Sequence, residues 1–101
     1  MWLFTNSAFI SIVADRDDPT KLLVRARLPH DINSVFPTAK LFSARHYDYQ
    51  YRALIDRREV AKVIAEQLLN VDYDNFKNSV RNKVRHAAYL GVWSVMHGIQ
   101  H

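Results

Sequence analysis

Two segments in which successive side chains alternate between two faces constrain the fold more than any other feature of this chain. Residues 22–28 place Leu22, Val24, Ala26 and Leu28 on one face, and Leu23, Arg25 and Arg27 on the other. Residues 47–55 place Tyr49, Tyr51, Ala53 and Ile55 on one face, and Asp48, Gln50, Arg52 and Leu54 on the other. Because side chains alternate across a β-strand, both segments are predicted strands with one buried face.

Two more strands complete the predicted pairs. The run AFISIVA at residues 8–14 is short, rich in β-branched residues and followed by Asp-Arg-Asp-Asp-Pro, which is turn chemistry. It therefore forms a predicted antiparallel hairpin with residues 22–28. Residues 40–44 form the predicted partner of residues 47–55, with the turn at Arg45 and His46.

Apolar residues at helical spacing predict three helical regions. Residues 30–36 form a short helix stopped by Pro37, and a longer amphipathic helix to about Leu69 begins at Asp56, which forms a capping-box arrangement with Glu59. Asp72 or Asp74 is expected to cap the last helical region, which ends at Gly98. That region either continues or restarts near residue 82; positive charge is unfavourable at a helix start, which favours a helix that runs through residue 81.

The predicted order is ββαββα, with an additional C-terminal helix, and this order indicates an α+β fold with a four-stranded antiparallel sheet. Moving the last strand of a ferredoxin-like sandwich to the N-terminus gives the same order, so a permuted ferredoxin-like sandwich accommodates it. The expected spatial order is first, second, fourth, third strand. We expect a single domain over residues 1–101, since 49% hydrophobic content at this length can fill one core.

Composition limits the chemistry and the compartment. The chain has no cysteine, which excludes disulfides and cysteine-ligated metals. The apolar N-terminal run lacks a basic start and is too short to span a bilayer, so we expect a soluble cytoplasmic protein without a membrane partner. A net charge of +4 permits a nucleic-acid or acidic partner but does not require one.

The predicted sheet gives one candidate binding surface. The tyrosine set is expected to face the helices, so the opposite face gathers the candidate binding residues Arg25, Arg27, Arg52 and Asp48, with His46 at the turn. Arginine suits phosphate, so this face could bind an anion or nucleic acid. The alternative is a solvated or helix-covered face in which Arg25 and Arg52 pair with carboxylates such as Asp48. RNA recognition by a sheet needs exposed aromatics beside the basic groups, and here the two sets are expected on opposite faces.

Other residues support weaker hypotheses. Arg81, Lys83 and Arg85 form a second candidate nucleic-acid surface. His46 and Asp48 could form an acid–base pair, although no nucleophile or phosphate-loop motif accompanies them. His97 and His101 have the i, i+4 spacing of metal ligands, but no carboxylate lies nearby, and a packing face explains them better. We therefore predict no metal site, no cofactor and no catalytic residue.

The stretch YLGVWSVMHGIQ is apolar around more than one helical face, which implies burial on two sides. A homodimer would cover the second side, with Leu90, Trp93 and Met96 as interface residues and Trp2 beside them. The expected function is accordingly that of a non-catalytic interaction or binding module. Its expected partner is a second copy of itself or another protein, and nucleic-acid binding is the alternative.

Several segments together resemble a known group of proteins. MWLFT, FISIV, VRAR, DYQYR, DYDNFK and YLGVWSVMH occur in this order along nearly the whole chain. They resemble a functionally uncharacterised family of small bacterial proteins, with DYDNFK and VWSVMH as the most specific segments. The resemblance implies a bacterial, single-domain, stand-alone protein, and it supplies no catalytic or binding residue.

Overall fold

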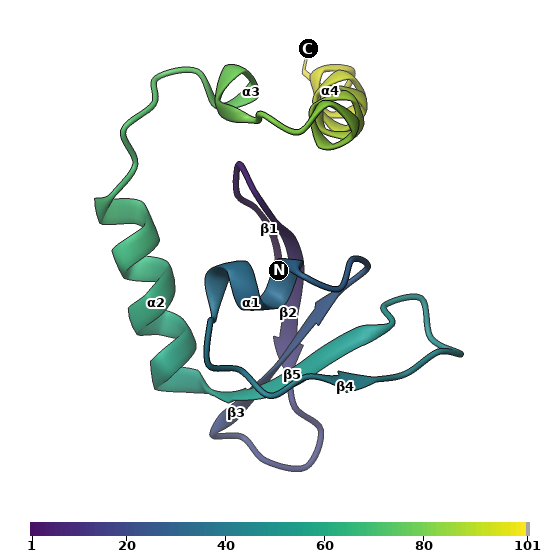
Figure 1. The fold of residues 1–101 in the computed structure, drawn as a ribbon, viewed down its shortest axis with the longest axis vertical. Helices are drawn as coiled ribbons and strands as arrows, with labels where there is room; N and C mark the ends of the chain where they lie inside the picture. Colours follow the sequence, from purple (N-terminus) through teal and green to yellow (C-terminus); the bar gives the residue numbers. More distant parts are fainter. Residues whose placement is uncertain (101) are drawn as a thin grey trace. The chain divides into compact units, whose positions relative to one another are not determined.

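The structure, a computed structural model, describes residues 1–100 (Figure 1). Contacts within the chain form two units: residues 1–71, and the described residues from Asp72 onward. The first unit contains strands β1 (Trp2–Phe4), β2 (Phe9–Ala14), β3 (Lys21–Ala26), β4 (Phe42–Ser43) and β5 (Tyr51–Asp56), and helices α1 (Asp31–Val35) and α2 (Arg57–Leu69). The second contains α3 (Phe76–Ser79) and α4 (Lys83–His97).

The first unit is built on a five-stranded antiparallel sheet in the order β1-β2-β3-β5-β4. The α+β class is confirmed, and so is the predicted neighbour order of the four strands β2 to β5. The prediction of four strands is wrong, because β1 pairs with β2 at the edge of the sheet. Its residue Trp2 was expected beside the interface residues of the last helix.

The core lies on the sheet face that was predicted. Val24 and Ala26 of β3 and Ala53 of β5 are fully buried, together with Ile10 of β2. Helix α1 contributes Ile32 and Val35 to this core, and α2 contributes Val60. Phe36, which follows α1, also belongs to it. Burying a valine, isoleucine or phenylalanine side chain stabilises a fold by about 1.5–3 kcal/mol. This cluster therefore fixes which side of the sheet the helices cover. Figure 1 shows α1 and α2 beside the sheet.

The helix starts were predicted in part. Asp56 caps α2 as expected, but its Oδ1 accepts from the backbone N–H of Arg58 (2.9 Å), at the second helical position. His30 occupies the cap position of α1 without a side-chain cap bond. The buried Asp31 instead accepts from the backbone N–H of Phe9 (3.0 Å), which ties α1 to β2.

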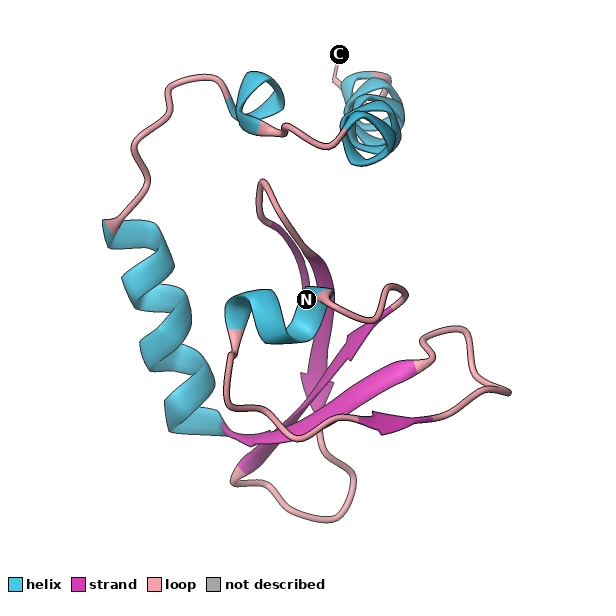
Figure 2. Cartoon of the chain, viewed as in Figure 1, coloured by secondary structure: helices cyan, strands magenta, loops and turns pink. Residues whose placement is uncertain are grey.

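Strands β4 and β5 are shorter than predicted, and residues 44–50 form the loop between them (Figure 2). The backbone N–H of Ala44 donates to the carbonyl of Gln50 (2.8 Å), and that of Tyr47 donates to the carbonyl of Ala44 (3.1 Å). Asp48 Oδ1 accepts from the N–H of Tyr49 (3.0 Å). These local bonds replace strand pairing, so the alternation predicted for residues 47–50 does not apply.

The second unit contains two helices capped by asparagine. The side chain of Asn75 accepts from Asn78 N at the start of α3, and that of Asn82 accepts from Arg85 N at the start of α4. The predicted caps Asp72 and Asp74 are not used. The expected helix through residue 81 is also wrong, because Val80 is extended and Asn82 begins a new helix. Gly98 ends α4 as predicted.

No helix within residues 1–100 has both the length and the apolar character needed to cross a membrane. The longest, α4, has 15 residues and begins with basic side chains.

Candidate functional site

The sheet face opposite the core carries the predicted arginines, and we call it the arginine face. Because side chains alternate along a strand, Arg25 points away from its buried neighbours Val24 and Ala26, and Arg52 points away from Ala53. Both helices of this unit add their apolar residues to the core side. The arginine face is therefore the side of the sheet without a helix of the first unit.

A row of five side chains crosses the arginine face from one sheet edge to the other. The register aligns Trp2 with Ser11, Ser11 with Arg25, Arg25 with Arg52, and Arg52 with Phe42. We call these residues the central row. Neighbouring strands lie about 4.8 Å apart, so the row is roughly 19 Å long. It has an exposed aromatic ring at each end, with Trp2 65% and Phe42 47% exposed.

Neutral groups hold the two guanidinium groups in the middle of the row. Arg25 Nη2 donates to Ser11 Oγ (2.7 Å), and Arg52 Nε donates to the carbonyl of Tyr49 (3.0 Å). Arg52 also lies over the ring of Tyr47, 4.6 Å from its centroid. The Nε of Arg25 is buried and has no hydrogen-bond partner among the described residues.

Arg27 adds a third cation to the same face. Its Nη1 donates to the backbone carbonyl of Asp48 (3.0 Å), and its guanidinium lies 4.5 Å from the ring centroid of Tyr49. Arg25 lies 4.7 Å from the same ring. The hydrogen bonds and ring contacts of Arg25, Arg27 and Arg52 within residues 1–100 thus involve neutral groups, and the expected pairing of Arg25 or Arg52 with the carboxylate of Asp48 is not formed.

The prediction that tyrosines and arginines occupy opposite faces is wrong for Tyr49. Tyr51 packs against the core as expected. Tyr49 is only 4% exposed, but its ring is buried against Arg25 and Arg27 and lies 6.5 Å from the ring of Phe9. The loop at residues 44–50 moves Tyr49 out of the strand alternation and onto the arginine face.

Two aromatic residues that sequence reasoning did not place on this face, Phe4 and Phe9, lie beside the central row. Phe9 stacks on Phe4 with ring centroids 4.6 Å apart, and it meets Trp2 edge-on at 5.8 Å. The alternation of residues 2–4 and 9–13 indicates which of these side chains share a face. Placing them on the arginine face also requires the pairing of β1 with β2. Aromatic and basic side chains therefore share one surface.

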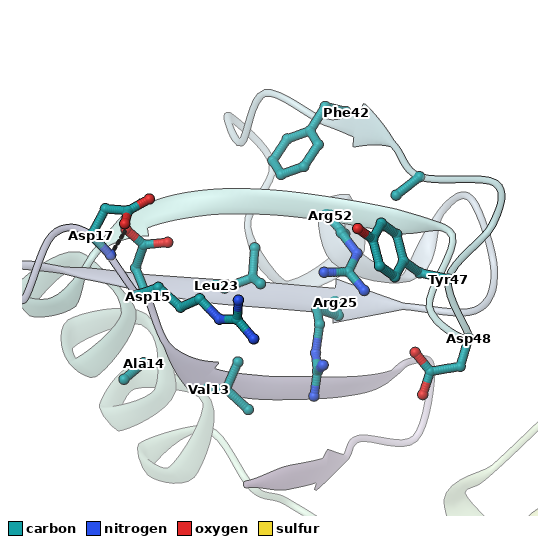
Figure 3. Close-up of a pocket in the computed structure, with 12 residues that line it drawn as sticks. Val13, Ala14, Asp15, Asp17, Leu23, Arg25, Phe42, Tyr47, Asp48 and Arg52 are labelled. Carbon is teal, nitrogen blue, oxygen red and sulfur yellow. Dashed lines mark hydrogen bonds between the residues drawn. The ribbon is translucent and has the colours of Figure 1, made fainter.

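A groove of about 620 Å³ lies over strands β2, β3, β5 and β4 on the arginine face (Figure 3). Leu23, Arg25 and Arg52 lie along its middle. Figure 3 shows Asp15 and Asp17 at one end, and Tyr47 and Asp48 at the other. Arg16 also lines it, whereas His46, the predicted partner of Asp48 in an acid–base pair, does not.

Charges in the groove are separated by position. The arginines make its middle positive, and the carboxylates make its two ends negative. Asp15 Oδ2 accepts from the backbone N–H groups of Asp17 (3.3 Å) and Asp18 (3.0 Å), so backbone dipoles partly compensate this carboxylate. The arrangement suits a ligand whose anionic group binds the arginines and whose hydrogen-bond donors bind the carboxylates at the two ends.

The remaining predicted site residues belong mainly to the second unit. Lys83 and Arg85 lie in the first turn of α4, and Arg81 precedes it. Arg85 Nη1 donates to the hydroxyl of Tyr89 (3.1 Å). The predicted interface residues Leu90, Trp93 and Met96 are exposed on α4, whereas Trp2 belongs to β1 of the first unit.

The histidines of α4 show no metal geometry. Within residues 1–100, no group of three or more histidine or acidic side chains is arranged to hold a metal ion. The ring of His97 instead stacks on Trp93 at 5.1 Å, and His101 lies outside the described residues.

Comparison with models of protein families, with curated proteins and with solved structures found no match to this chain.

Proposed function

We propose that this chain is a non-catalytic binding module that binds single-stranded nucleic acid across its arginine face. The central row supports this proposal most directly. It places Arg25 and Arg52 side by side, with Trp2 and Phe42 exposed at the ends. Single strands are bound by basic groups that contact phosphates and by aromatic rings on which bases stack.

The exposed rings favour a single strand over a duplex. In a duplex the bases stack on one another, so their faces are not available to protein side chains. Trp2 and Phe42 offer ring surface to unpaired bases at both ends of the row. Each base–aromatic stack contributes about 1–3 kcal/mol in single-strand complexes.

The neutral contacts of the two guanidinium groups favour a phosphate ligand. An arginine that already pairs with a carboxylate would have to exchange that partner for phosphate. Arg25 and Arg52 contact a hydroxyl, a carbonyl and rings, and these leave their charge uncompensated. A phosphate can accept two parallel N–H bonds from one guanidinium.

Salt dependence tests this proposal. We would measure the anisotropy of a labelled single-stranded oligonucleotide between about 50 and 200 mM salt, where two phosphate contacts give a log–log slope of about −1.4. Arg52→Gln should weaken binding and reduce the slope by about 0.7. Arg58→Gln is the matched control, because it removes the same charge from an exposed position in the first turn of α2.

Absence of binding at the lowest salt concentration would refute the proposal. An equal loss of affinity in Arg52→Gln and Arg58→Gln would also refute it, because the effect would then follow net charge and not the central row.

A second candidate function is self-association through α4. Leu90, Trp93 and Met96 are exposed on this helix, and a second copy of the chain would cover their apolar surface. Light scattering during size-exclusion chromatography tests it: a mass that stays at 11.8 kDa at high concentration would refute the homodimer.

We also propose that the first unit is a permuted ferredoxin-like sandwich with β1 added at its edge. The neighbour order β2-β3-β5-β4 and the two helices on the core side support this assignment. It agrees with the proposed function, because helices on one face leave the other available to a ligand.

A further inference from the structure

Three carboxylates line the groove on the arginine face, and Asp48 is the one that lies beside the exposed Tyr47. Asp48 extends from the loop at residues 44–50 into the end of the groove beside Tyr47 (Figure 3). A carboxylate repels phosphate, so Asp48 at this end of the groove suits a ligand group that donates hydrogen bonds. We propose that Asp48 selects nucleotides whose base carries an exocyclic amino group, a role that rests on the proposed function.

Two hydrogen bonds fix Asp48 in place. Its Oδ1 accepts from the backbone N–H of Tyr49 (3.0 Å), and its backbone carbonyl accepts from Arg27 Nη1 (3.0 Å). Its second carboxylate oxygen, Oδ2, has no hydrogen-bond partner within residues 1–100. The carboxylate is therefore a positioned acceptor with unused capacity, since each ionised carboxylate has about four lone-pair sites.

The chemistry of the bases decides which of them this acceptor prefers. Cytosine presents its N4 amino group as a donor, and carboxylates accept a hydrogen bond from this group in protein–DNA complexes. Uracil presents the O4 acceptor at the same position, and its N3–H lies between two carbonyl oxygens. A carboxylate near this edge is attracted by cytosine and repelled by uracil. Adenine and guanine also carry amino donors.

The groove has room for one nucleotide in this orientation. Its volume of about 620 Å³ lies within the range of small-ligand sites. Arg25 and Arg52 would hold the phosphate in the middle, and the base would extend toward Asp48. The neighbouring Tyr47 is 65% exposed, and the ring face away from Arg52 offers a surface for the base.

The test compares labelled oligocytidine with oligouridine of equal length, because the two pyrimidines have similar size. The protein should bind oligocytidine roughly 5- to 150-fold more tightly. Asp48→Ala should bring this ratio close to one and strengthen oligouridine binding, because the repulsion is lost. Asp48→Asn tests the same point while keeping the side-chain shape, in case the alanine variant fails to fold.

Asp17→Ala is the matched control, because it removes a carboxylate from the other end of the same groove. It should leave the cytidine-to-uridine ratio unchanged. Equal binding of both oligonucleotides by the original protein, or a ratio that Asp48→Asn leaves intact, would overturn base selection while nucleic-acid binding stands. Binding of neither oligonucleotide would overturn both proposals.

Discussion

Arg25 on β3 and Arg52 on β5 lie directly opposite each other, so two like charges occupy neighbouring places on one sheet face. Like charges directly opposite each other destabilise a sheet. An anion between them should relieve this repulsion. Inorganic phosphate should therefore raise the Tm of the original protein more than that of Arg52→Gln, as measured by thermal unfolding at constant ionic strength. Equal increases in Tm would contradict a shared anion site.

The ring of Tyr49 should stabilise the first unit through its two arginine contacts. Tyr49→Ala removes a buried ring and should lower the free energy of unfolding by about 3 kcal/mol, as large aromatic truncations do. Tyr49→Phe keeps the ring and should cost less than about 1 kcal/mol. Urea denaturation measures both values, with the exposed Tyr47→Ala as the control. A Tyr49→Phe loss as large as that of Tyr49→Ala would assign the effect to the hydroxyl.

The buried carboxylate of Asp31 should be important for stability because it satisfies the backbone N–H of Phe9. Asp31→Ala leaves that donor without its partner and should cost about 1–3 kcal/mol. Urea denaturation provides the measurement. Asp74→Ala is the control, since Asp74 is exposed in the second unit, and it should change stability by less than about 0.5 kcal/mol. Equal losses in the two variants would contradict the proposed role.

Asp18 should titrate below its ordinary pKa of 3.8. The hydroxyl of Thr20 (2.6 Å) and then its backbone N–H (2.9 Å) donate to Asp18 Oδ1, and these bonds lower the pKa of Asp18. A lowered folded-state pKa gives stability that is present above 3.8 and is lost as the pH falls through the folded value. Thr20→Val should raise the pKa of Asp18 toward 3.8 in an NMR titration. An unchanged pKa would show that the hydroxyl is not the cause.

Alternation in the sequence predicted the core side of the sheet, because it depends only on which residues of one strand share a face. Val24, Ala26 and Ala53 are buried together for this reason. Alternation failed at Tyr49, where the Asp48 side chain binds the local backbone and the strand has not yet begun. Only the structure shows that Tyr49 belongs with the arginines.

Pairings between distant residues account for most of what sequence reasoning missed. The alignment of Trp2, Arg25 and Phe42 depends on the register of all five strands, which one sequence does not encode as a visible pattern. The residue that caps a helix is decided by competition among neighbouring candidates. Asp72, Asp74 and Asn75 are all suitable cap residues, so residue type alone could not identify Asn75.

The two edges of the sheet are also its shortest strands, with three residues in β1 and two in β4. Unpaired backbone groups on a long edge act as a template on which further chains can add strands and aggregate. Edges this short offer few such groups. The protein can therefore expose a surface rich in aromatic rings with little risk of forming fibrils through its sheet edges.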